Sequence, residues 1–108
     1  MIEKKTQLGG TNLQVPPIMF GTGFLGNLYQ GLPYEIKLQI VSEWFKHVKP
    51  PVVVDTAGKY GAGLALEVIG QTLRELGISC EDVIISNKLG WTRTPLTTPE
   101  PTFEPGAW

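Results

Sequence analysis

Three side chains suited to proton transfer follow apolar stretches of the chain. Asp55 ends the run Val52-Val53-Val54-Asp55, and Tyr60 comes five positions later in a glycine-rich loop. Lys88 follows a second, largely apolar run at residues 83–86. A valine would pack better than a carboxylate at the end of a buried strand, which makes Asp55 a candidate site residue. Because a lysine cation favours the phenolate form of a nearby tyrosine, Tyr60 beside Lys88 can give or accept a proton near neutral pH.

The two apolar runs predict the strands that would bring these side chains together. Consecutive β-branched residues are typical of a strand buried on both faces in a parallel sheet. The carboxyl ends of adjacent parallel strands lie at one edge, roughly 5 Å apart. Asp55 and Lys88 are therefore expected to form a partly buried pair, with Tyr60 beside them. On spacing alone, an ordinary salt bridge next to a surface tyrosine explains the pattern equally well.

Two amphipathic helices are predicted between the strands. Pro33 suits the first position of a helix, and apolar residues recur behind it at helical spacing. They are Ile36, Ile40, Val41, Trp44, Phe45 and Val48. A second helix is expected over residues 65–76, closed by Gly77 in the left-handed position after its last turn.

The order of elements predicts an α/β fold. Residues 1–17 form a hairpin around the turn at residues 9–12, and residues 18–90 follow as β-α-β-α-β with right-handed crossovers. Residues 91–108, rich in proline and threonine and without periodicity, are expected to be a long loop.

Residues 21–26 match the pattern G-x-G-x-x-G directly after a predicted strand. A dinucleotide-binding fold needs a helix to begin within that loop, so that its N-terminus faces the pyrophosphate. Asn27, Gly31 and Pro33 intervene here, and Asp55 lies 29 residues past Gly26, whereas the ribose-binding acid lies about 20 residues on. We interpret the match as coincidental. The glycines either let the flat ring of a cofactor approach the backbone or form a plain tight loop.

Composition and charge argue against several classes of protein. Nine basic and ten acidic residues give a net charge of −1, and no basic run indicates binding to nucleic acid or to a membrane surface. No apolar run approaches ~18 residues and the N-terminus lacks an apolar signal segment, so neither a membrane span nor secretion is expected. A single cysteine cannot form a disulfide within the chain, which makes the cytoplasm the expected compartment.

The only histidine and the only cysteine have ordinary structural explanations. His47 lies in the last turn of the first predicted helix, where an imidazole stabilises the helix C-terminus. Cys80 belongs to no metal-binding motif and is expected to pack as a small buried residue. No metal site is predicted.

Several motifs together resemble the aldo-keto reductase family. They are Leu8-Gly9-Gly10-Thr11-Asn12, Phe20-Gly21-Thr22-Gly23, Asp55-Thr56-Ala57-x-x-Tyr60-Gly61-x-Gly63 and Asn87-Lys88-Leu89-Gly90. The resemblance covers about residues 7–90 and implies a (β/α)₈ barrel whose bottom is closed by the hairpin. It also implies interconversion of carbonyl and alcohol with NADP or NAD as cofactor.

The resemblance assigns roles to residues at matching positions. Tyr60 would be the general acid/base, Lys88 its cationic partner and Asp55 the carboxylate that holds Lys88. The turn Gly21-Thr22-Gly23, together with Asp55, would lie beside the nicotinamide ribose. Apart from the resemblance, the position of Trp91 three residues past Lys88 suits a wall of the substrate pocket, although a packed loop anchor explains it equally well.

Two departures from the family pattern refine this expectation. Where the family commonly has Ser-Glu near the start of the second helix, this chain has Ala65-Leu66, with Glu67 one place later. That looks like the sugar-oxidising branch (aldose, L-fucose and pyridoxal dehydrogenases), which interconverts an aldehyde or lactol with an alcohol or lactone. A closed barrel also needs roughly 250 residues. Residues 1–108 are therefore expected to be the N-terminal part of one barrel, inactive alone and completed by its remainder or by another chain. The family's catalytic histidine would lie beyond residue 108.

Two other functions remain open at this point. An aldo-keto reductase-like chain could serve as a non-catalytic binding or regulatory subunit. A small Rossmann-like nucleotide-binding protein requires the glycine loop to open directly into a helix, and an irregular segment at residues 27–32 would exclude it.

Overall fold

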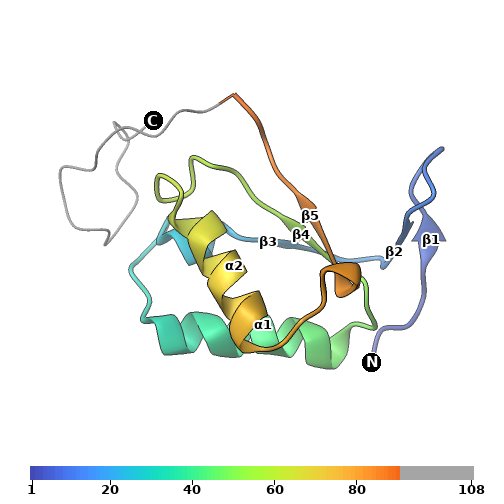
Figure 1. Ribbon diagram of the computed structural model, residues 1–108, viewed down its shortest axis with the longest axis horizontal. Coiled ribbons are helices and arrows are strands. Elements are labelled where there is room, and N and C mark those ends of the chain that lie inside the picture. Colours follow the sequence, from blue (N-terminus) through green and yellow to red (C-terminus); the bar gives the residue numbers. More distant parts are fainter. Residues whose placement is uncertain (91–108) are drawn as a thin grey trace.

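The computed structural model describes residues 1–90 as a hairpin followed by a small α/β unit (Figure 1). Strands β1 (Thr6–Gln7) and β2 (Gln14–Val15) pair antiparallel. Strands β3 (Met19–Gly21), β4 (Val52–Asp55) and β5 (Val83–Ser86) form a parallel sheet with β4 in the centre. The observed order of elements is the one expected from the sequence.

The structure describes nothing beyond residue 90. The expected long loop at residues 91–108, and with it Trp91, therefore lies outside the described residues.

Strand β4 is the buried centre of the unit. Val52, Val53 and Val54 are at most 4% exposed, as the run of β-branched residues predicts. Val52 and Val54 join the core between sheet and helices. Because side chains alternate along a strand, Asp55 projects from the opposite face, the one that the helices leave uncovered.

Helix α1 (Tyr34–His47) packs on the sheet through a stripe that differs slightly from the predicted one. Val41, Trp44 and Val48 are buried, and the Trp44 ring stacks on Phe20 with 4.9 Å between centroids. The prediction was wrong for Ile36, which is 40% exposed, while Lys37 is buried. Positions 37, 41, 44 and 48 are the ones that share a face at helical spacing. Lys37 tolerates burial there because its Nζ donates a hydrogen bond to the Leu25 carbonyl at 3.0 Å.

Helix α2 (Leu64–Glu75) covers the same side of the sheet. Its buried residues are Ala65, Val68, Ile69 and Thr72. The chain leaves the helix through Gly77 at φ 68°, with Gly77 N–H bonded to Arg74 O and Ile78 N–H to Leu73 O. This pair of bonds is the Schellman arrangement, so the expectation for Gly77 is confirmed.

The 3₁₀ turn η2 (Cys80–Asp82) leads into β5. Its N-cap residue Ser79 accepts a hydrogen bond from Glu81 N–H. The expectation that Cys80 is buried was wrong: the thiol is exposed, because the whole turn lies at the surface with no buried residue.

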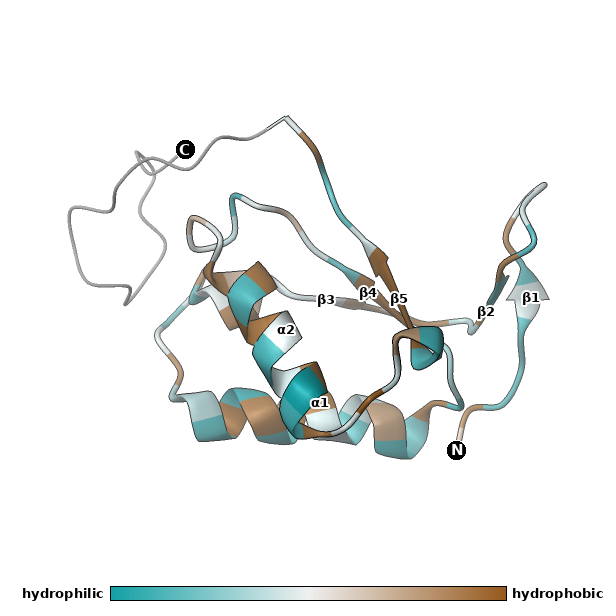
Figure 2. Cartoon of the chain, in the orientation of Figure 1, coloured by the Kyte–Doolittle hydropathy of each residue, from teal (hydrophilic) through white to brown (hydrophobic). Residues whose placement is uncertain are grey.

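Parts of the parallel sheet are coloured as hydrophobic in Figure 2, and some of these apolar side chains remain exposed. Met19 of β3 is 55% exposed and Ile85 of β5 is 44% exposed. Within residues 1–90, β3 and β5 each pair only with β4, so each has an open edge. A parallel sheet with helices on one face and open strands is consistent with part of a (β/α)₈ barrel. Neither α1 nor α2 has the length and apolar character needed to span a membrane, and residues 1–90 contain no other α-helix.

Candidate active site

The candidate residues lie at the carboxyl edge of the parallel sheet. The register aligns Gly21, Asp55 and Ser86, which are the last residues of β3, β4 and β5. Lys88 follows Ser86 by two residues, and Tyr60 follows Asp55 by five. The sheet therefore brings groups that are distant in the sequence together along its carboxyl edge.

Lys88 and Asp55 form the predicted ion pair. Lys88 Nζ lies 3.6 Å from Asp55 Oδ2 and donates a 3.4 Å hydrogen bond to the Thr56 carbonyl. The two side chains are 50% and 37% exposed, so water screens their attraction. A pair of this kind contributes about 0–1 kcal/mol to stability, which means that it holds the lysine in place more than it holds the fold together.

Tyr60 completes the cluster from the loop before α2. Lys88 Nζ lies 6.0 Å from the centroid of the Tyr60 ring, near the outer limit of a cation–π contact. The ring is partly buried against the core cluster. The structure thus brings Asp55, Tyr60 and Lys88 together, as the sequence predicted. We refer to them as the acid/base cluster.

The backbone after Tyr60 has an unusual conformation. Gly61, Ala62 and Gly63 all have positive φ, at 67°, 53° and 99°. The left-handed conformation costs an alanine roughly 1 kcal/mol, so Ala62 is held there by its surroundings. Tyr60 O accepts a 3.2 Å hydrogen bond from Ala65 N–H, and Gly61 O accepts one of the same length from Leu64 N–H. The loop is therefore anchored to the first turn of α2.

Thr22 links the glycine loop to the acid/base cluster. Its side chain is fully buried, and Oγ1 donates a 3.0 Å hydrogen bond to the carbonyl of Asp55. The sequence analysis missed this role, because a threonine after a strand has no pattern that names its acceptor 33 residues away. The neighbouring Thr56 is also fully buried, and its Oγ1 has no hydrogen-bond partner within residues 1–90.

The glycine loop does not open into a long helix. Residues Gly23–Gly26 form the 3₁₀ helix η1, residues 27–33 are irregular, and α1 begins only at Tyr34. The pyrophosphate geometry of a Rossmann fold is therefore absent from this loop, which excludes the small nucleotide-binding alternative.

Gly21 offers open backbone beside the acid/base cluster. A Cβ built on Gly21 would meet nothing within 4 Å, and Gly21 pairs in register with Asp55. The backbone of Gly21 is therefore open on the side where a side chain would stand. Because the Thr22 side chain is fully buried and its hydroxyl donates to the Asp55 carbonyl, contacts with a cofactor at this turn would come from backbone. In this respect the residues fit the nicotinamide end of NADP or NAD.

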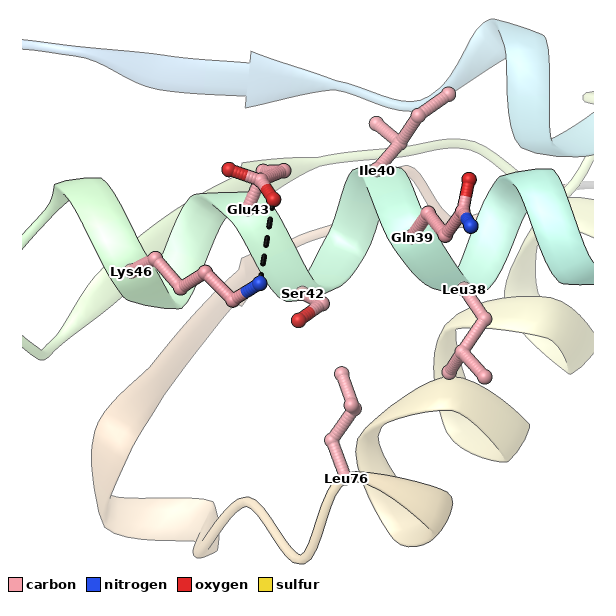
Figure 3. Close-up of a pocket in the computed structure, with 7 residues that line it drawn as sticks. All are labelled: Leu38, Gln39, Ile40, Ser42, Glu43, Lys46 and Leu76. Carbon is pink, nitrogen blue, oxygen red and sulfur yellow. Dashed lines mark hydrogen bonds and ion pairs between the residues drawn. The ribbon is translucent and has the colours of Figure 1, made fainter.

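Two pockets of the described residues lie away from the acid/base cluster. One, of about 550 Å³, opens between residues 38–46 of α1 and Leu76, and the 3.3 Å pair Lys46–Glu43 belongs to its lining (Figure 3). Another, of about 460 Å³, lies between residues 27–37 and α2. None of Asp55, Tyr60 and Lys88 lines either pocket. Within residues 1–90, no group of three or more His, Cys, Asp or Glu side chains is placed to hold a metal ion.

His47 precedes β4, whereas Asp55 is the last residue of that strand. His47 ends α1 and pairs with Glu43, 2.9 Å from Nε2 to Oε2, as expected of a residue in the last helical turn. The neighbouring backbone bonds to Ile2, so this end of the unit contacts the N-terminal segment.

Comparison with known proteins agrees with this geometry. The model of the aldo/keto reductase family matches residues 17–104, a span that includes Asp55, Tyr60, Lys88 and the glycine loop. No curated protein shows significant similarity to the chain.

Proposed function

Because the chain belongs to the aldo/keto reductase family, we propose that Tyr60 is the general acid/base of an NAD(P)-dependent oxidoreductase. Family membership indicates this class of chemistry and a TIM-barrel fold. The observation that supports the role of Tyr60 is the position of Lys88 Nζ, 3.6 Å from Asp55 and 6.0 Å from the Tyr60 ring.

The proposed proton transfer uses only residues of the acid/base cluster. In the reducing direction, Tyr60 donates its phenolic proton to the substrate carbonyl oxygen, which becomes the alcohol. The positive charge of Lys88 favours the phenolate that remains, and Asp55 keeps Lys88 at the ring. The reduced cofactor, when bound, supplies the hydride to the carbonyl carbon. In the oxidising direction the phenolate takes the proton from the alcohol.

We place the substrate among sugars and related aldehydes. The support is the sequence Ala65-Leu66-Glu67 near the start of α2, in place of the Ser-Glu common in the family. The reaction would interconvert a lactol or aldehyde with a lactone or alcohol. A panel of aldoses and simple aldehydes, followed at the nicotinamide absorbance band with NADP and with NAD, tests the substrate and the cofactor together.

More strands are needed to cover this site. The open edges of β3 and β5, with Met19 and Ile85 exposed, support completion of the sheet by the remainder of a barrel or by another chain. Sedimentation and thermal melts of residues 1–108 test this. A monomeric species that melts cooperatively would contradict it.

A non-catalytic role as a binding or regulatory subunit is the second candidate. It is favoured by one observation, that neither pocket contains a residue of the acid/base cluster. Quenching of tryptophan fluorescence by NAD(P)H in the full-length protein, without turnover of any carbonyl substrate, would support it over the enzyme.

Tyr60→Phe in the full-length protein is the decisive test of the enzymatic proposal. General acid–base catalysis contributes about 10²- to 10⁴-fold, so kcat should fall by that factor while cofactor binding is retained. Tyr29→Phe is the matched control, because Tyr29 is 83% exposed in the irregular segment before α1. If the two variants turn over equally fast, Tyr60 is not the acid/base.

A further inference from the structure

The loop after β3 and the loop that carries Tyr60 meet backbone against backbone. A Cβ built on Gly26 would lie 2.5 Å from both C and O of Tyr60 and 3.0 Å from N of Gly61. A Cβ built on Gly61 would in turn clash with O of Gly26. Real side chains do not approach backbone this closely, so the two loops fit together only because both positions are glycine.

Close approach, not backbone conformation, is the reason for glycine at position 26. Gly61 has φ 67°, a conformation that already favours glycine, but Gly26 has no positive φ. An alanine can adopt the conformation of Gly26 and is excluded only by the peptide between Tyr60 and Gly61. Gly10 differs in this respect, since a Cβ there would meet nothing within 4 Å.

The contact involves the peptide group between Tyr60 and Gly61, which is bonded directly to the Cα atom that carries the Tyr60 side chain. Tyr60 O is bonded on its other side to Ala65 N–H at 3.2 Å, in the first turn of α2. The peptide is thus held between η1 and α2. A methyl group on Gly26 must push this peptide away or displace η1. Movement of the peptide alters the distance from Tyr60 to Lys88.

We propose that Gly26 is a positioning residue for Tyr60, acting through the backbone contact between Gly26 and the Tyr60–Gly61 peptide. The proposal rests on the proposed function of Tyr60 as acid/base. A misplacement of the order of 1 Å costs about 100-fold in rate, so kcat of Gly26→Ala should fall by about 10- to 100-fold.

The test compares Gly26→Ala with Gly10→Ala in the full-length protein. The concentration of folded sites is taken from titration with NAD(P)H by tryptophan fluorescence, and kcat is expressed per cofactor-binding site. A loss of folded protein then does not imitate a loss of rate. We expect kcat per site to fall in Gly26→Ala alone, with the KM for the cofactor within about twofold of wild type in both variants.

A double-mutant cycle with Tyr60→Phe distinguishes action through Tyr60 from general damage. If Gly26 acts through Tyr60, Gly26→Ala has no further effect on the residual rate of Tyr60→Phe. An additional loss of the same size in that background overturns the proposal. Wild-type turnover in Gly26→Ala, while Tyr60→Phe is inactive, overturns this proposal alone. Full turnover in Tyr60→Phe overturns the proposed function, and this inference with it.

A measurement without turnover completes the test. In ¹⁵N-labelled protein, the amide resonance of Gly61 should move in Gly26→Ala and stay in place in Gly10→Ala. If Gly26→Ala does not fold, the test is made on the wild-type protein, in which the contact predicts an NOE between the Gly26 α-protons and the Gly61 amide proton. Absence of that NOE overturns the proposal.

Discussion

Replacing Lys88 by methionine separates a catalytic role of this lysine from a contribution to stability. Methionine keeps much of the apolar stem and removes the charge. The pair with Asp55 has side chains that are 50% and 37% exposed, so its loss should lower the free energy of unfolding by no more than about 1 kcal/mol. The free energy of unfolding alone therefore says little about the role of Lys88.

The effect on proton transfer is expected to be larger. Lys88 Nζ lies 6.0 Å from the Tyr60 ring centroid. For two opposite unit charges that distance apart, Coulomb's law gives an attraction of about 0.7 kcal/mol at the dielectric constant of water and of about 2.8 kcal/mol at an effective value of 20. These energies correspond to about 3-fold and about 100-fold in rate. Once the site is covered and drier, the larger figure applies.

The assay measures kcat at saturating substrate and the free energy of unfolding in urea for Lys88→Met and Lys46→Met. The control removes a comparable pair, since Lys46 lies 3.3 Å from Glu43 with side chains 64% and 54% exposed, on α1 away from the acid/base cluster. Both variants should unfold at nearly the same free energy, and only Lys88→Met should lose turnover. Equal turnover in the two variants would refute the electrostatic role of Lys88. A loss of several kcal/mol in unfolding free energy would show instead that the lysine is mainly structural.

Two further predictions concern stability and titration. Thr56→Val should raise the free energy of unfolding by about 1 kcal/mol, because a methyl group of the same shape replaces a buried hydroxyl that lacks a partner within residues 1–90. Urea unfolding measures this change. A loss of stability in the variant would show that the hydroxyl has a partner. The hydrogen bond from the Tyr34 phenol to the Glu75 carboxylate raises the pKa of Tyr34 to about 12. The folded state then holds a proton that the unfolded state loses near its ordinary value of 10.0, so this contribution to stability is complete below pH 10 and is lost as the pH rises through 12. Tyrosinate absorbance should show the pKa of Tyr34 falling in Glu75→Gln and unchanged in Glu81→Gln, and a Tyr34 that titrates alike in both variants would contradict the assignment.

Local sequence was sufficient to predict the elements, because each carries its own physical signal. Three valines indicate a buried strand, Gly77 ends α2 where an L-residue would be strained, and helical spacing identified Val41, Trp44 and Val48. Prediction was weaker where packing across elements decided the outcome. Ile36 and Lys37 differ by one position on α1, and a hydrogen bond to the Leu25 carbonyl, from the preceding loop, helps to make burial of the lysine acceptable.

The acid/base cluster divides in the same way. The residue types at positions 55, 60 and 88, at the ends of two apolar runs, determined which groups could transfer a proton, and parallel pairing was enough to predict that they meet. The tertiary structure alone decided how they are held. The Thr22 hydroxyl donates a hydrogen bond to the carbonyl of Asp55, and the peptide after Tyr60 occupies the space that a side chain at Gly26 would need. Neither contact was predicted, because contacts between separate loops depend on a spatial arrangement that no local pattern encodes.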